Sequence, residues 1–342
     1  MPRGKVRQTD IAREAGVGIA TVDRVLNDRS GVSPRTAQRV WDALRLLETR
    51  NGIGGETLRR NLVMDFILPG GPNTFMALLE QASLDAAGAF APLGVRTRCH
   101  RVDGFDPQVL AESIRRIGAR SNGLAIVALE NPVVREAVND VTAAGVPVVT
   151  VVANLSGSRA IGYVGLNNRS AGRTAGYLMG RFLAGRTGPV AVMEGSLNLS
   201  YRDHQERELG FCDALREQFP HLEVAGRWQT HDHFEEAHRV TAQALARHGD
   251  LCGIYCIGAG IRGVAGAVKE SGRGQDVVLI GHDLHRYTRP YLIDGTIDAI
   301  IDQNPTFEAR EALRLLVDHH LADAPAPPVM PRVEVFLREN LP

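Results

Sequence analysis

Short apolar runs alternate with amphipathic stretches over most of the chain, and this alternation restricts the fold more than any other feature. The runs are almost continuously apolar, as parallel strands buried on both faces are. The stretches between them repeat their apolar residues with the helical period, so the alternation predicts a doubly wound parallel sheet. The runs are 62–68, 123–129, 147–152, 189–193, 253–257, 277–280 and 297–301, and the helical stretches are 106–117, 132–144, 170–183, 207–219, 235–247 and 261–271.

The length of the chain indicates more than one such sheet. The sequence has 342 residues, which is more than one ordinary hydrophobic core holds. We therefore expect two α/β lobes behind a separate N-terminal domain. Hydrophobic residues make up 44% and charged residues 23% of the chain, an ordinary composition for a soluble protein. No run approaches the roughly 18 apolar residues that a membrane span needs.

The first 48 residues predict three short helices instead. Thr9 is expected to cap the first helix, and Gly16 to form a tight turn, because glycine tolerates a positive φ. Ser33 and Pro34 make a strong start for the third helix, since proline is favoured at the first helical position. Two helices joined by so tight a turn form a helix-turn-helix. Its expected core is Ile11, Ala12, Ala15, Val17, Val22, Val25, Leu26, Val40, Trp41, Leu44 and Leu47.

A helix-turn-helix places its second helix in the major groove of DNA, with the N-terminal residues of that helix foremost. Ile19 and Ala20 are then expected to face base edges, where their contacts are mainly apolar. Thr21, Arg24 and Asn27 are expected to bond phosphates or bases. A generic three-helix bundle is the alternative interpretation.

The N-terminal stretch resembles the lactose-repressor (LacI/GalR) family of bacterial transcriptional regulators. Two serines of the family, which cap the recognition helix and touch phosphate, are replaced here by Gly18 and Asp23. Gly18 still suits a cap. A phosphate repels Asp23, which would instead pair with Arg24 or Arg13 or accept a hydrogen bond from a cytosine amino group. The resemblance is carried by Asp10-Ile-Ala, Ala15-Gly-Val, Ala20-Thr-Val-Asp-Arg-Val-Leu-Asn27, Gly31-Val-Ser33, Thr36 and Arg39-Val40.

The segment 49–61 lies where members of that family carry a short hinge helix that pushes a leucine into the minor groove. Leu58 falls at the leucine position. Gly52, Gly54 and Gly55 disfavour a helix by about 1 kcal/mol each relative to alanine. A flexible tether is therefore as good an interpretation as a hinge helix. The expected DNA contacts are Thr9, Ile19, Ala20, Thr21, Arg24, Asn27 and Leu58.

Polar side chains follow the apolar runs of the body. Ligands of open parallel sheets lie beyond the carboxyl ends of the strands, so these side chains are candidates for a binding site. Carboxylates and amides together with an aromatic ring suit a hydroxyl-rich ligand. The candidates include Asn73, Phe75, Glu130, Glu194, His282, Asp283 and Asp302-Gln-Asn304.

The body in turn resembles the type I periplasmic sugar-binding fold, in which three crossovers join two Rossmann-like lobes. Arg207-Glu-Leu-Gly-Phe211 matches the family motif whose arginine holds the effector. Ile280-Gly-His-Asp283 matches the motif whose aspartate takes two sugar hydroxyls. The implied effector contacts are Asn73, Phe75, Glu130, Arg207, His282, Asp283 and Gln303.

Two departures fall in this implied site. Gly258 stands where the family has an asparagine or aspartate, and His282 stands where the family has an aromatic residue. Both indicate an effector other than a plain hexose or pentose: a larger polyol, an acidic sugar or a phosphorylated sugar.

These patterns predict a small all-α helix-turn-helix head and an α/β body that is similar to a type I periplasmic binding protein, with two Rossmann-like lobes. The expected domains are the head at 1–48, a linker or possible hinge at 49–61 and the effector domain at 62–342. Lobe 1 is expected at about 62–165 and 303–328, and lobe 2 at about 166–302 and 329–342.

The predicted function is a ligand-responsive regulator, which we expect to be a cytoplasmic homodimer that binds a near-palindromic operator. It is expected to repress genes of carbohydrate uptake or catabolism and to respond to a sugar or sugar derivative. Residues 1–61 carry 12 basic and 7 acidic side chains and the remainder 27 and 32, which fits a head that meets phosphates. A solute-binding protein of a sugar transporter is the alternative, although the charged N-terminus lacks the apolar core of a secretory signal.

No enzyme, cofactor or metal is expected. The chain has no P-loop, no GxSxG and no GxGxxG that opens a helix, and its four cysteines form no disulfide framework. The cluster of His231, His233 and His238 is interpreted as a loop at the mouth of the ligand pocket rather than a metal site. The glycine-rich segment 258–263 is interpreted as close strand–helix packing rather than an anion site.

Overall fold

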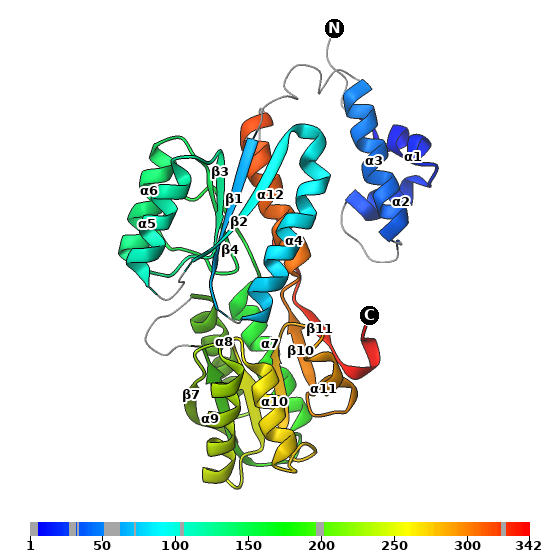
Figure 1. The fold of residues 1–342 in the computed structure, drawn as a ribbon. Helices are drawn as coiled ribbons and strands as arrows, with labels where there is room; N and C mark the ends of the chain where they lie inside the picture. Colours follow the sequence, from blue (N-terminus) through cyan, green and yellow to red (C-terminus); the bar gives the residue numbers. More distant parts are fainter. Residues whose placement is uncertain are drawn as a thin grey trace. The chain divides into compact units, whose positions relative to one another are not determined.

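The computed structural model describes residues 6–26, 32, 34–50, 62–71, 73–102, 106–195, 202–322 and 326–342. The chain forms two compact units, a head within residues 1–61 and a body that begins at Leu62 (Figure 1). The predicted DNA contacts Asn27 and Leu58 lie outside the described residues, as does most of the linker.

The head is a cluster of three helices, α1 (Gln8–Ala15), α2 (Ile19–Leu26) and α3 (Pro34–Arg50). Its core contains every apolar residue that the sequence predicted, with Val22 and Val40 fully buried at its centre. Gly16 adopts φ 61°, which confirms the predicted turn. Gly18 accepts the first helical bonds of α2 from the amides of Thr21 and Val22, so it does occupy the cap position.

The predicted capping role of Thr9 is wrong. The N-cap of α1 is Arg7, whose carbonyl accepts hydrogen bonds from the amides of Asp10 and Ile11. The helix therefore begins earlier than the threonine suggested, and Thr9 lies exposed within its first turn. The side chain of Thr9 is therefore not held in the position of a helix cap.

The first lobe of the body is a five-stranded parallel sheet with strand order β2-β1-β3-β4-β5. Helices α5 and α6 cover one face, and α4 and α12 cover the other (Figure 1). The elements are β1 (Leu62–Pro69), α4 (Thr74–Phe90), β2 (Val95–Val102), α5 (Pro107–Gly118), β3 (Gly123–Ile126), α6 (Pro132–Ala143), β4 (Val148–Val151), β5 (Gly162–Val164) and α12 (Pro305–Leu321).

The second lobe is a six-stranded sheet with strand order β11-β10-β9-β8-β6-β7, in which only β11 runs antiparallel to its neighbour. Successive residues of a strand point to opposite faces, so each strand contributes to two cores. The elements are α7 (Asn168–Phe182), β6 (Gly188–Glu194), α8 (Arg202–Gln218), β7 (Leu222–Gln229), α9 (Phe234–Arg247), β8 (Gly253–Cys256), α10 (Ile261–Glu270), β9 (Val278–His282), α11 (Arg289–Ile293), β10 (Ala299–Asp302) and β11 (Glu334–Phe336).

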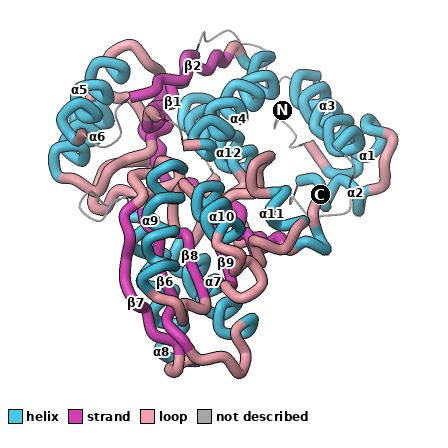
Figure 2. The backbone as a smooth tube through the Cα atoms, turned by 60° about the horizontal axis from the view of Figure 1, so that its bottom comes forward, coloured by secondary structure: helices cyan, strands magenta, loops and turns pink. Residues whose placement is uncertain are grey.

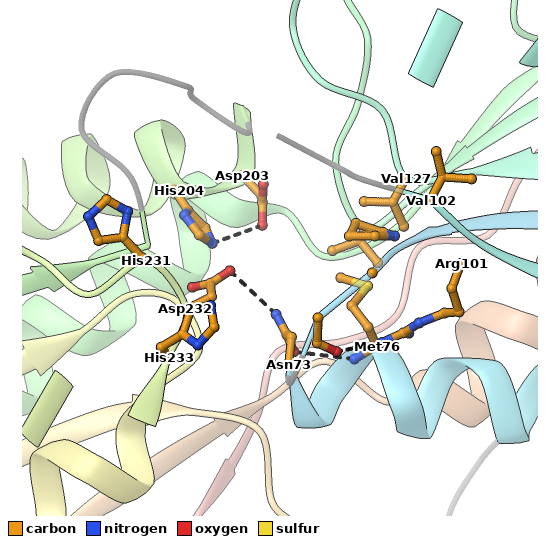
Figure 3. A pocket seen from close by; sticks show the side chains of 14 residues that line it. Asn73, Met76, Arg101, Val102, Val127, Asp203, His204, His231, Asp232 and His233 are labelled. Carbon is orange, nitrogen blue, oxygen red and sulfur yellow. Dashed lines mark hydrogen bonds and ion pairs between the residues drawn. The ribbon is translucent and has the colours of Figure 1, made fainter. Parts of the chain in front are cut away.

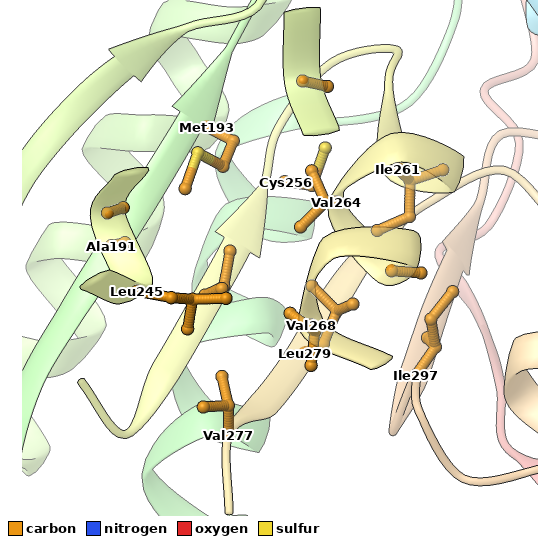
Figure 4. Close-up of a cluster of buried hydrophobic side chains, with 14 of the residues drawn as sticks. Ala191, Met193, Leu245, Cys256, Ile261, Val264, Val268, Val277, Leu279 and Ile297 are labelled. Atoms are coloured by element: carbon orange, nitrogen blue, oxygen red, sulfur yellow. The ribbon is translucent and has the colours of Figure 1, made fainter. Parts of the chain in front are cut away.

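The two cores of the second lobe lie on either side of its sheet. Helices α9 and α10 lie on one side of the sheet (Figure 2). Ile254 and Cys256 belong to the core beneath these helices, where Figure 4 shows Cys256 near Val264. Tyr255 and Ile257, which alternate with them, pack beneath α7 and α8. Burial on both faces explains why this strand reads as a continuous apolar run.

The chain crosses between the lobes three times, from β5 to α7, from β10 to α12 and from α12 to β11. The apolar run 123–129 forms strand β3 only as far as Ile126. Its last three residues continue beyond the sheet edge and stay buried. The carboxyl ends of the parallel strands in both lobes supply the residues that line the site described below.

Glycines allow α7 and α8 to pack closely. A Cβ atom at Gly172 of α7 would overlap the carbonyl of Arg207 in α8, and one at Gly210 of α8 would overlap the carbonyl of Arg169 in α7. Gly172 therefore lets the backbone of Arg207 lie against α7, and Gly210, the glycine of the Arg207–Phe211 motif, lets α8 make the reciprocal approach at Arg169.

We expect Gly172→Ala to lower the free energy of unfolding of the body by about 1–3 kcal/mol, because the added methyl group overpacks this contact. Gly88→Ala is the control. Gly88 is an exposed glycine of α4 with open space around it, so its replacement should stabilise the body by about 0.4–1 kcal/mol. Denaturant unfolding measures both, and equal effects of the two variants would contradict the close packing.

Candidate functional site

Two neighbouring cavities lie between the lobes. The larger cavity has a volume of about 450 Å³ and the smaller about 290 Å³. Gly71, Asn73 and Asp232 line both, so the two share a wall. Figure 3 shows the larger cavity, whose other polar lining residues are Arg101, Asp203, His204, His231 and His233.

The shared wall is a contact between the lobes. Asn73 caps α4, where its Oδ1 atom accepts a hydrogen bond from the amide of Met76 at 3.3 Å. Its Nδ2 atom donates to Oδ2 of Asp232 in the other lobe at 3.5 Å (Figure 3). The second carboxylate oxygen of Asp232 accepts from the amide of Ala259 at 3.1 Å. His231 and Asp232 both have positive φ values, 52° and 57°, and such strained conformations gather at functional sites.

The space beside Gly258 is filled by side chains from elsewhere in the chain. A Cβ atom at Gly258 would lie 2.8 Å from the His204 ring and 3.0 Å from Oδ1 of Asp232. A Cβ atom at Gly195 would lie 2.5 Å from that same oxygen. The carboxylate of Asp232 therefore lies where a side chain at position 258 would begin. The sequence alone did not predict this position of Asp232. Its one indication was Gly258, a glycine without an explained role.

The smaller cavity holds four of the predicted effector contacts, Asn73, Phe75, His282 and Asp283. Phe75 lies in the first turn of α4 and is 4% exposed. His282 is fully buried and shares a hydrogen bond of 2.8 Å with the hydroxyl of Tyr255. Burial holds the pKa of His282 well below its ordinary value, so this ring is neutral. Burial also raises the pKa of Asp283 to about 7, helped by the nearby charge of Asp302.

Arg207 and Gln303 are not among the described residues that line either cavity. They lie beneath the smaller one in a buried chain of hydrogen bonds. Arg207 donates to Asn168 at 2.8 Å, to the carbonyl of Ile257 at 3.0 Å and to Oε1 of Gln303 at 2.5 Å. Gln303 donates to Oδ1 of Asp283 at 2.7 Å. Gln303 therefore positions Asp283 directly, and Arg207 acts on Asp283 through Gln303.

Glu130 is likewise absent from the described lining of both cavities. Its carboxylate accepts hydrogen bonds from Arg135 at 2.8 Å and from the amide and hydroxyl of Ser156 at 3.0 and 2.9 Å. Arg202 of the other lobe bonds the same Ser156 hydroxyl and lies 3.9 Å from Glu130. The structure thus places Glu130 at a second contact between the lobes.

Three buried polar atoms of cavity-lining residues have no hydrogen-bond partner among the described residues. Nη1 of Arg101 and Oδ1 of Asp203 belong to the larger cavity, and Nδ1 of His282 belongs to the smaller. Unpaired buried polar groups are costly. These three atoms are therefore suited to a polar ligand that enters the cavities.

The described part of the chain contains no group of three or more His, Cys, Asp or Glu side chains that could hold a metal ion. His231 and His233 line the larger cavity, whereas His238 bonds Glu270 at 2.9 Å on the outside of α9 and α10. Among the described helices, none is long and apolar enough to cross a membrane.

The exposed face of α2 carries the predicted DNA contacts of the head. Ile19 is 50% exposed, and Ala20 and Arg24 are exposed beside it. Thr21 is half-buried. The exposed apolar side chain of Ile19 fits apolar contact with base edges.

A model of the periplasmic binding protein domain matches residues 64–322. The chain belongs to this family. A second model, of the lacI family of bacterial regulatory proteins, matches residues 9–48. The periplasmic binding protein domain is therefore preceded by a lacI-type helix-turn-helix domain.

The similar proteins include both transcriptional regulators and sugar-binding proteins. The HTH-type transcriptional regulator RegA of Clostridium saccharobutylicum is 37% identical over 83 residues, 24% of this chain and 25% of that protein. The D-ribose/D-allose-binding protein of Pseudomonas aeruginosa is 29% identical over 162 residues, 45% of this chain and 48% of that protein. These matches span a quarter to a half of the curated relatives.

A solved solute-binding protein of an ABC transporter from Burkholderia graminis C4D1M, in complex with D-arabinose, has a TM-score of 0.75. It is 23% identical, and the match covers 82% of this chain and 97% of that one. At this level of identity the likeness is one of fold.

We predict that Asp283→Asn becomes more stable relative to the wild type as the pH rises. Because the pKa of Asp283 is about 7 in the folded protein and near 3.8 when unfolded, the folded state binds the proton more tightly. The stability that protonated Asp283 contributes is therefore lost as the pH rises from about 4 to 7. Asparagine does not titrate and still accepts the bond from Gln303. Denaturant unfolding at pH 5, 6, 7 and 8 measures the difference, and a constant difference would contradict the burial of an ionisable Asp283.

Proposed function

We propose that the protein is a sugar-responsive, DNA-binding transcriptional regulator. The observation that carries this proposal is the presence, in one chain, of a lacI-type head with an exposed α2 face and a body with polar cavities between two lobes. The regulator relatives support it. The protein acts as a homodimer in the cytoplasm, binds a near-palindromic operator and represses genes of carbohydrate uptake or catabolism.

The effector is a hydroxyl-rich molecule that enters between the lobes. Asp232 and Asp283 offer carboxylate oxygens to its hydroxyls, and Phe75 offers an apolar ring in the lining of the smaller cavity. Arg207 and Gln303 hold Asp283 in place. Glu130 lies near Arg202 at the second contact between the lobes. The site binds and releases the effector unchanged, because its residues serve recognition rather than acid–base chemistry.

The effector acts on the contacts between the lobes. Asn73–Asp232 and Arg202–Ser156 both join one lobe to the other, so a ligand placed among them alters the relative orientation of the lobes. The segment 49–61, with Leu58, transmits this change to the heads on DNA. Coupling between two such sites is typically about 1–3 kcal/mol.

A solute-binding protein is the alternative function, and the match to the D-ribose/D-allose-binding protein favours it for the body alone. The lacI-type head distinguishes the two functions, because binding a solute does not require an exposed DNA-recognition helix. Specific DNA binding by the full chain would exclude the alternative.

We expect the full chain to select a near-palindromic sequence from a random DNA library, with an affinity that falls steeply with salt. Arg24→Ala should weaken binding to that sequence about tenfold, because it removes a contact to a base or phosphate. Arg239→Ala in the body, where Arg239 pairs with Glu236 on the same helix, should leave binding unchanged. A chain without any sequence preference would overturn the proposed function.

We further expect Asp232→Asn to weaken the response to the effector while operator affinity without effector stays near the wild-type value. The variant keeps the shape of Asp232 but loses a charged acceptor at the wall of both cavities. Effector-dependent release from the operator, followed by fluorescence anisotropy, measures the change. A full response from the variant would show that the cavities do not hold the effector.

A further inference from the structure

The rim of the smaller cavity carries an arginine held between two aromatic rings. The Cζ atom of Arg262, at the start of α10, lies 4.6 Å from the ring centroid of Phe234 and 4.7 Å from that of Tyr287. All three residues line the cavity. Stacking on aromatic faces fixes the plane of a guanidinium, so less conformational freedom is lost when that guanidinium binds a ligand.

The donors of this guanidinium are available. Within the described part of the chain, no hydrogen bond or ion pair joins Arg262 to another residue, and its side chain is exposed. Neighbouring Arg286, in contrast, donates to the hydroxyl of Tyr287 at 2.7 Å. A planar fork of free donors matches the two oxygens of a carboxylate or phosphate.

Other features of the same cavity also point to a ligand. Nδ1 of His282, a side chain that is 1% exposed, has no partner among the described residues. Helix α10 starts at Gly260 without a side-chain cap, which adds a favourable field for an anion near Arg262. The glycines themselves serve packing, as the sequence suggested, because a Cβ atom at Gly263 would overlap the carbonyl of Phe234.

The cavity thus combines two kinds of recognition group. Asp283 and Asp232 accept hydrogen bonds from hydroxyls, whereas Arg262 and Arg286 supply positive charge at the rim. A neutral sugar satisfies the first kind and leaves the guanidinium of Arg262 unpaired. A hydroxyl-rich molecule that carries an anionic group satisfies both.

We propose that the effector is an anionic sugar derivative, a sugar acid or a sugar phosphate, whose anionic group binds the guanidinium of Arg262 between Phe234 and Tyr287. This inference rests on the proposed function, since it names the ligand class of the same site. It gives Arg262 the role of a specificity residue, which distinguishes charged from neutral sugars.

The test compares matched ligands on the full chain. Thermal shift and calorimetry use D-ribose, D-ribonate and D-ribose 5-phosphate, and D-glucose, D-gluconate and D-glucose 6-phosphate. At least one anionic member should bind more tightly than its neutral parent, and the carboxylate and phosphate members distinguish the two sources of charge. Arg262→Gln should weaken that member about 10-fold to 100-fold, as expected for hydrogen bonds to a charged group, and leave the neutral parent nearly unchanged.

Arg239→Gln is the control, because Arg239 lies on neighbouring α9 and pairs with Glu236 outside the cavity. It should bind every ligand as the wild type does. The proposal is overturned if the neutral parents bind best, if no anionic member binds, or if Arg262→Gln binds the anionic ligand as the wild type does. Operator release by a neutral sugar would overturn the anionic class alone, whereas the absence of operator binding would overturn the proposed function.

Discussion

A buried chain of hydrogen bonds holds the body together where the polypeptide crosses between its lobes. Arg207 connects Asn168 at the start of α7 with Gln303 just before α12, and Gln303 continues the chain to Asp283. A hydrogen bond to such a buried charged group is typically worth about 1.5–3 kcal/mol. Because two crossovers and the cavity wall share this chain, a ligand that bonds Asp283 acts on the residues around which the lobes would turn.

Two glycines shape the cavities beside this chain of hydrogen bonds. Gly195 and Gly258 leave space at the ends of β6 and β8, and His204 and Asp232 fill it from two other segments. The carboxylate of Asp232 therefore faces Asn73 across the lobes. The smaller cavity is therefore lined by Asp232 and Asp283 together with Arg262, whose guanidinium stacks on Phe234 and Tyr287.

Much of this fold could be predicted because buried parallel strands and caps have strong local signals. Strands β1, β6 and β8 are almost continuous apolar runs, with Asp65 within β1 and Glu194 at the end of β6, and the head packs as its periodicity predicted. Edge strands β2 and β7 were missed, since polar residues alternate along them and one face of each is exposed. Asn73, Phe75, His282 and Asp283 were found from their place after strands. Asp232 and Arg262 were not, because their roles depend on tertiary contacts with Gly258, Phe234 and Tyr287.

The central claim is that one molecule couples an effector between the lobes to DNA on the head, and such coupling is reciprocal. The most direct measurement is the effector dissociation constant of the full chain, by calorimetry, with and without saturating operator duplex. The account predicts that the two constants differ by about 5-fold to 150-fold, the same factor by which the effector changes operator affinity. Equal effector affinities in both states would contradict it.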